Sequence, residues 1–275
     1  MISFQQDTTE QRWRMLAPHI QAYGPDNDER LPAVILFHGC AGVRPHIEIY
    51  ARKAAELGHR AFVIDSYAAR GWNPAWATTF VCAGAGFWGR ERAGDVLAAT
   101  YGVRRLENVD ESRIALAGWS HGSWSIMDLM TMPLDRPGEG GLLDPSPDYL
   151  EGVLSLFLAY PYGGVGALSR NRAWVRGPET LAIVCEKDHI TGQADALRVL
   201  EAPRQGGAKV QLWMAPGTHA FDSPGHEGFP SPMRYDPDLA SESLRRFERF
   251  IDRTLLHAKD PKPSRRRDGK VAAEA

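Results

Sequence analysis

The sequence has few cysteines and no long run of apolar residues. Its three cysteines, Cys40, Cys82 and Cys185, are an odd and sparse set that does not make a disulfide framework. The longest apolar runs, near residues 34–37 and 153–159, are far too short to span a membrane. The N-terminus also lacks the basic region followed by an apolar region that is typical of a signal peptide. We therefore expect a cytoplasmic protein.

An excess of charge of either sign is also missing. The 275 residues include 32 Lys and Arg and 34 Asp and Glu, which gives a formal net charge of −2. This balance argues against a protein that binds nucleic acid or a membrane surface. The His, Cys and carboxylate residues do not cluster at the spacing of metal ligands, so we expect no metal ion. The sequence does not indicate an oligomeric state.

No linker rich in Pro, Gly or Ser divides the chain, so we expect one main domain at residues 31–257. Residues 1–30 predict an N-terminal extension packed on this domain, and residues 258–275 predict a disordered tail. Within the domain, apolar runs that predict buried strands alternate with helical patterns. This alternation predicts an α/β fold, with a mostly parallel central sheet and helices on both faces.

The most informative motif is the pentapeptide Gly-Trp-Ser-His-Gly at residues 118–122. It follows an apolar run at 113–117 and precedes a helical pattern at 123–132. A G-x-S-x-G sequence between a strand and a helix is typical of a nucleophile elbow, where the glycines permit a strained turn that exposes the serine hydroxyl. Ser120 is therefore the candidate nucleophile. The alternative is a serine that only caps the helix.

A serine nucleophile needs a histidine base and a carboxylate that orients the histidine. Asp188 and His219 each follow a predicted strand, and they occur in the order serine, acid, histidine that hydrolases with this elbow share. We expect them to be the acid and the base. The alternatives are Glu186 and Asp195 for the acid, and His226 and His257 for the base.

The loop at residues 38–42, His-Gly-Cys-Ala-Gly, follows the first strong strand pattern. Its glycines allow backbone amides to turn toward the serine, so we expect the amides of Cys40 and His121 to form an oxyanion hole, with Ala41 as the neighbouring option. We expect Cys40 to contribute only its backbone and His38 to brace the loop. Cys185 is expected to be inert core, and the role of Cys82 stays open.

Five motifs together resemble the dienelactone hydrolase family of α/β-hydrolases: LFHGCAG, DSYAARG at residues 65–71, GWSHG, EKD and GTHAFD. The resemblance covers about residues 31–256. It implies a triad of Ser120, Asp188 and His219 and no cofactor. Position 120 is serine, whereas the founding dienelactone hydrolases carry a cysteine nucleophile. This departure favours a more general carboxylic ester over dienelactone as the substrate.

Large aromatic residues and one arginine predict the substrate-binding surface. We expect the segment 66–89 to line the acyl or alcohol pocket, because it follows a strand at the carboxyl end of the sheet. The arginine would bind a substrate carboxylate or form a surface ion pair. Residues 133–149, rich in Pro and Gly, predict a surface loop or part of a lid. The substrate-binding candidates are Tyr67, Arg70, Trp88, Trp119 and Tyr160.

These features predict a serine hydrolase that cleaves a small-molecule ester or lactone through an acyl-enzyme intermediate. An acyltransferase, or a peptidase acting on small amides, would use the same residues. A non-catalytic ligand-binding protein of this fold is a further alternative, and it would fail to react with a fluorophosphonate probe.

Overall fold

The computed structural model describes residues 6–225 and 232–256, which form one seven-stranded sheet covered by helices. The strand order is β1-β3-β2-β4-β5-β6-β7, and only β1 runs antiparallel to its neighbour. The predicted mostly parallel sheet is thereby confirmed. The strands are β1 (Ile20–Tyr23), β2 (Leu31–Phe37), β3 (Arg60–Ile64), β4 (Val109–Trp119), β5 (Val153–Ala159), β6 (Glu179–Lys187) and β7 (Val210–Thr218).

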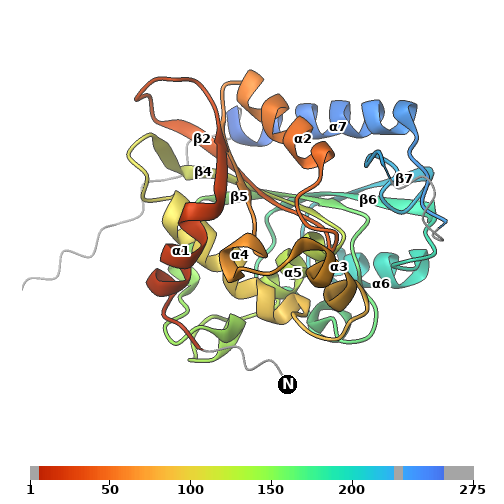
Figure 1. The fold of residues 1–275 in the computed structure, drawn as a ribbon, viewed down its shortest axis with the longest axis horizontal. Helices are drawn as coiled ribbons and strands as arrows, with labels where there is room; N and C mark the ends of the chain where they lie inside the picture. Colours follow the sequence, from red (N-terminus) through yellow and green to blue (C-terminus); the bar gives the residue numbers. More distant parts are fainter. Residues whose placement is uncertain (1–5, 226–231, 257–275) are drawn as a thin grey trace, which may run out of the picture.

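Helices cover both faces of the sheet, as Figure 1 shows. On one face lie α2 (Pro45–Glu56) and α7 (Pro237–Leu256). The other face carries α1 (Thr9–Leu16), α4 (Gly89–Val103), α5 (His121–Met130) and α6 (Gln193–Gln205). This arrangement buries the central strands on both sides, which explains why β2 and β3 are almost continuously apolar in sequence. None of the described helices is long and apolar enough to cross a membrane.

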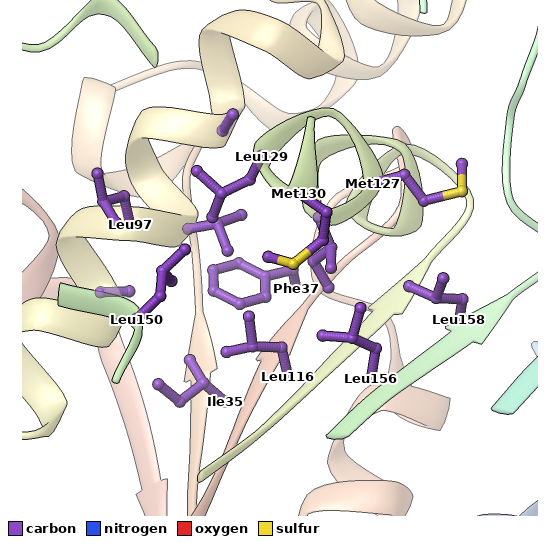
Figure 2. Packing of buried hydrophobic residues seen from close by; sticks show 14 of the residues in the cluster. Ile35, Phe37, Leu97, Leu116, Met127, Leu129, Met130, Leu150, Leu156 and Leu158 are labelled. Carbon is purple, nitrogen blue, oxygen red and sulfur yellow. The ribbon is translucent and has the colours of Figure 1, made fainter. Parts of the chain in front are cut away.

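The larger apolar core lies between the sheet and α4 and α5. Figure 2 shows Phe37, Leu116 and Leu156 of three adjacent strands facing Leu129 and Met130 of α5. All five side chains are buried. Helix α4 is buried along almost its whole length, because α1 and a loop pack on its outer side. The core therefore fixes the start of α5, where the pentapeptide lies.

Two segments that the sequence singled out contain short helices in the structure. The segment 66–89 contains the helix α3 (Pro74–Cys82) and a short 3-10 turn, Ala68–Arg70. The segment 133–149 contains the short turn Glu139–Gly141 and the first residues of Pro147–Leu150, and it packs against α1 and α4. The Asp144 carboxylate accepts a hydrogen bond of 2.6 Å from the Thr9 amide. The predicted boundary at residue 30 stays a prediction, and the tail at 258–275 lies outside the described residues.

A buried ionic cluster connects α4 to α1 and to the loop after β3. Asp95 of α4 is fully buried, and its carboxylate accepts hydrogen bonds from Arg12 at 3.0 Å and from both terminal amines of Arg70 at 2.8 Å. Burial by itself would raise the pKa of Asp95, but the charges of Arg70 and Arg12 outweigh burial and lower the pKa to about 2. The carboxylate is therefore ionised at neutral pH.

Replacement of Asp95 by asparagine should lower the free energy of unfolding by about 3–5 kcal/mol, because two arginines lose their buried counter-charge. The unfolded carboxyl titrates near 3.8 and the folded one near 2, so the stabilisation is present above pH ~4 and is lost as the pH falls toward 2. Urea unfolding at pH 7 and pH 3 measures both effects.

The exposed pair Glu48–Arg52 provides the control for this variant. Glu48→Gln should change the free energy of unfolding by less than ~0.5 kcal/mol. Equal losses in the two variants would contradict a special role of the buried cluster.

Candidate active site

Ser120 lies in a strained turn between β4 and α5. Its φ of 51° and ψ of −109° are outside the regions that residues with side chains normally adopt. The flanking glycines permit this turn because they allow close backbone contacts. A Cβ at Gly118 would overlap the Ser123 amide, and a Cβ at Gly122 would overlap the Phe37 carbonyl oxygen. This geometry is that of a nucleophile elbow.

The side chains of Ser120, His219 and Asp188 form a continuous hydrogen-bonded chain. The His219 Nε2 lies 3.0 Å from the Ser120 Oγ, and the His219 Nδ1 lies 2.9 Å from an Asp188 carboxylate oxygen. A carboxylate can only accept, so Nδ1 carries the proton and Nε2 accepts from the serine hydroxyl. This is the tautomer that a general base requires.

Asp188 is held as a carboxylate by several donors. It accepts hydrogen bonds from the amides of Ile190 and Thr191 and from the Thr191 hydroxyl, all between 2.8 and 2.9 Å. Burial by itself would raise the pKa of Asp188, but the bonds from His219 and Thr191 lower it to about 2. The sequence did not single out Thr191, although its position three residues after the acid is typical of such a turn.

The alternative acids and bases have other surroundings. Asp195 pairs with Arg170 at 2.8 Å, and Glu186 is exposed. His226 and His257 lie outside the described residues. Among the described candidates, Asp188 is the carboxylate that binds His219.

The predicted oxyanion loop lies against the elbow. Gly39 lies so close to Ser120 that a Cβ there would be 3.5 Å from the Ser120 Cβ, and both Cys40 and His121 line the same cavity as Ser120. The His121 amide is at the start of α5, where helical N–H groups have no partner within the helix. His38 is fully buried and donates from Nδ1 to the Gly39 carbonyl at 2.7 Å, as expected of a histidine that braces the loop.

Cys40 and Cys82 form a disulfide, with their Cα atoms 5.4 Å apart. This corrects the expectation that the three cysteines do not make a disulfide framework: an odd number leaves one thiol over but allows the other two to pair. Cys40 follows β2 and Cys82 ends the helix that follows β3, and these strands are neighbours in the sheet. The bond connects the loop at residues 38–42 to α3. Cys185 is a buried free thiol, as predicted for inert core.

A cavity of about 340 Å³ opens beside Ser120. Its walls come from the end of α3, from α5 and from the loops after β5 and β6. Val165 is 83% exposed and Ile190 is 49% exposed, so the walls include apolar side chains that remain open to solvent. No lining residue belongs to the segment 133–149. The residues that line the cavity beside Ser120 are Cys40, Val81, Cys82, Ala83, Gly84, Trp88, His121, Trp124, Tyr162, Val165, Ile190 and Thr191.

Only Trp88 of the five predicted substrate-binding residues lines this cavity. The side chain of Arg70 is 10% exposed and is bound to Asp95 and to the Ser66 carbonyl, so the prediction that it binds a substrate carboxylate is wrong. Tyr67 is buried and donates to the Cys40 carbonyl at 3.0 Å. It supports the loop and does not line the cavity.

Trp119 and Tyr160 point to a buried carboxylate instead. The Tyr160 hydroxyl donates to Asp222 at 2.7 Å, and the Trp119 indole N–H donates to it at 3.3 Å. The Tyr50 hydroxyl is a third donor, at 3.0 Å. The Tyr160 ring also contacts His219, with ring centroids 4.7 Å apart. These two predictions are therefore corrected: both residues hold the His219 loop from behind.

The segment 66–89 lines the cavity only through its last part, residues 81–84 and 88. Trp72, Trp76 and Phe80 pack against one another, with ring centroids 4.8–6.5 Å apart. The sequence did not indicate Trp124 and Tyr162 as part of the cavity wall. Their ring centroids lie 4.7 Å apart there. Trp124 lies four residues after Ser120, so its helical position on the elbow side was the available signal.

Residues 20–136 match the family model of the dienelactone hydrolase family. The predicted resemblance to the dienelactone hydrolase family is confirmed. No curated protein matches the sequence significantly. Among the described residues, no group of three or more His, Cys, Asp or Glu side chains could hold a metal ion.

Solved structures of dienelactone hydrolase-like proteins and esterases share the fold. A dienelactone hydrolase-like promiscuous phosphotriesterase from metagenomic libraries is 17% identical, with a TM-score of 0.63 over 86% of this chain and 92% of that one. An esterase from the planctomycete Thermogutta terrifontis is 16% identical, with a TM-score of 0.61 over 88% of this chain and 91% of that one. At these identities the likeness shows the fold alone. The fold is the predicted α/β-hydrolase fold.

The Cys40–Cys82 disulfide predicts a definite thiol count. Protein unfolded in denaturant without reductant should expose one reactive thiol, that of Cys185, and reduction should raise the count to three. Titration with a thiol reagent measures both values. In the Cys185→Ser control, no thiol should react before reduction. Three reactive thiols in the unreduced wild-type protein would contradict the disulfide.

Proposed function

We propose that this protein is a serine hydrolase that cleaves small, neutral carboxylic esters. The hydrogen-bonded chain from Ser120 through His219 to Asp188, on a strained elbow beside an open cavity, is the observation that carries the proposal. A serine hydroxyl in an ordinary helix cap needs neither a histidine nor this backbone conformation. A non-catalytic role would leave both unexplained.

In the proposed reaction, His219 Nε2 takes the proton as the Ser120 Oγ attacks the ester carbonyl carbon. The amides of His121 and Cys40 receive the negative charge on the carbonyl oxygen. The tetrahedral intermediate expels the alcohol, which takes the proton from His219, and an acyl-enzyme remains. Water then attacks the acyl-enzyme with the same base and releases the acid. Asp188 stays ionised and stabilises the imidazolium that forms in each half.

The cavity walls indicate the substrate class. Among the described residues that line the cavity there is no Lys, Arg, Asp or Glu. Burial together with the Arg92 charge lowers the pKa of His121 to about 3, so this side chain is neutral as well. A carboxylate placed against these walls would lose hydration without gaining a counter-charge. We therefore favour neutral esters with apolar groups over acidic lactones.

The location of the protein stays a prediction. The expected cytoplasmic location rested partly on the cysteine count, and the Cys40–Cys82 disulfide removes that support, because disulfides persist mainly in oxidising compartments.

Replacement of Ser120 by alanine should lower kcat for p-nitrophenyl butyrate by about 10⁶-fold, if the three residues act as a unit. His219→Ala should cost about as much. Asp188→Asn should cost about 10⁴-fold, because the imidazole loses the partner that fixes its tautomer. Steady-state kinetics measures these losses.

Intact-mass spectrometry after incubation with a fluorophosphonate gives an independent test. The wild-type protein should gain one adduct, on Ser120, and Ser120→Ala should gain none. The solved structure of Thermogutta terrifontis esterase 2 phosphorylated by paraoxon is that of a protein of the same fold that reacts with an organophosphate. Full esterase activity in Ser120→Ala would contradict the proposal.

The wild-type enzyme should prefer p-nitrophenyl butyrate over the p-nitrophenyl monoester of succinic acid by about 10- to 100-fold in kcat/KM, since the second places a charge in a neutral cavity. Val165→Lys should narrow this preference by about 2- to 5-fold, because it adds a cation at an exposed position of the cavity.

Val175→Lys is the matched control for this variant. Val175 is 54% exposed but does not line the cavity, so the preference should stay unchanged. A wild-type enzyme that prefers the acidic ester would contradict the proposed substrate class.

A further inference from the structure

Arg92 is a fully buried cation on α4 whose surroundings differ from those of Arg12 and Arg70. Arg12 and Arg70 bind the Asp95 carboxylate directly. Within the described part of the chain, no carboxylate lies within ion-pair distance of Arg92. A buried guanidinium without a direct counter-charge is costly, so its remaining contacts should account for its presence.

The contacts of Arg92 reach three segments at the carboxyl edge of the sheet. Its Nη1 donates to the His38 carbonyl at 2.6 Å and to the His121 Nδ1 at 3.0 Å. Its Nε donates to the Ser66 hydroxyl at 3.2 Å. His38 opens the loop that carries Cys40, and His121 follows the nucleophile. One nitrogen atom of Arg92 therefore connects the two segments that carry the proposed oxyanion donors.

The His121 ring is locked by this contact. A guanidinium can only donate, so the His121 Nδ1 accepts and its Nε2 carries the proton. Nε2 donates to the Phe87 carbonyl at 2.7 Å, so both ring nitrogens are engaged inside the protein. The imidazole is 4% exposed and connects Arg92 to Phe87, which lies two residues before the start of α4. It has no free nitrogen for acid–base chemistry.

We propose that Arg92 is a positioning residue for the oxyanion hole: it fixes the Cys40 loop relative to the His121 amide. The inference rests on the proposed function. An oxyanion hole stabilises the transition state well only if its two donors are held in place before the reaction. Donors that must first reorganise stabilise the transition state less. Arg92 touches neither the cavity nor the triad, so it acts through the two backbone segments that it joins.

The test compares Arg92→Met and Arg92→Lys with Arg70→Met. Arg70 is the matched control, because it is also largely buried and bonded to the loop after β3 but makes no hydrogen bond to His38 or His121 in the described part of the chain. Each variant is assayed for kcat and KM with p-nitrophenyl butyrate. Each is also assayed for inhibition by an alkyl trifluoromethyl ketone, which forms an oxyanion on serine, and by the matched methyl ketone, which serves as a ground-state mimic.

Loss of the oxyanion geometry should weaken only the two quantities that depend on the transition state, which are kcat and inhibition by the trifluoromethyl ketone. We expect Arg92→Met to lower kcat by about 10²- to 10³-fold and to weaken the trifluoromethyl ketone by a similar factor, while KM and methyl ketone inhibition change less than ~3-fold. Arg92→Lys should lie between, since one ammonium can still donate to His38 or His121. Arg70→Met should leave kcat within ~3-fold of wild type, even if its melting temperature falls.

Other outcomes overturn the inference. If Arg92→Met behaves like Arg70→Met in kcat and in both inhibition constants, Arg92 is a structural residue only. If Arg92→Met does not fold, the same comparison is made with Arg92→Lys, and a kcat equal to wild type overturns the inference. Failure of the wild-type protein to react with a fluorophosphonate at Ser120 would refute the proposed function instead, so the two failures are distinguishable.

Discussion

The backbone of Ser120 adopts a conformation that residues with side chains rarely occupy, and the rest of the candidate site depends on it. The conformation persists because Gly122 packs against the carbonyl of Phe37 and Gly118 packs against the turn that follows. Phe37 in turn belongs to the core between the sheet and α5 (Figure 2). Packing of the apolar core thus keeps the elbow in contact with the end of β2. The same contact brings the loop that begins at His38 next to Ser120.

Buried polar groups fix the loops around the candidate site, which the apolar core does not fix. On the α2 and α7 face, Asp222 accepts from Tyr50, Trp119 and Tyr160, and this network supports the loop of His219. On the α4 face, Arg92 and Asp95 join the loops after β2 and β3 to α4. Figure 1 shows these two helical layers on opposite faces of the sheet. The side chains of the candidate site therefore lie between two separate sets of buried hydrogen bonds.

The differences between expectation and structure have one physical origin. Trp119, Tyr160 and Arg70 all lie at the correct edge of the sheet, as the positions of the strand ends predicted. Their side chains nevertheless point away from the cavity, because each finds a buried carboxylate on another segment. Asp222 and Asp95 are distant from these residues in sequence, so no local pattern reveals the pairing. The cavity walls instead come from Trp124, Tyr162 and the end of α3.

The sequence by itself determined the strand and helix alternation, the elbow, and the identities of Asp188 and His219 as the groups near Ser120. These features are accessible because the carboxyl ends of parallel strands meet at one edge, so a residue that follows a strand is placed by the strand alone. Only the tertiary structure decided which other segments the side chains at this edge contact. It paired Cys40 with Cys82, engaged Arg70 with Asp95 and connected His38 to His121 through Arg92. Such contacts join segments on different elements, and their direction depends on how the helices pack against the sheet rather than on any local sequence pattern.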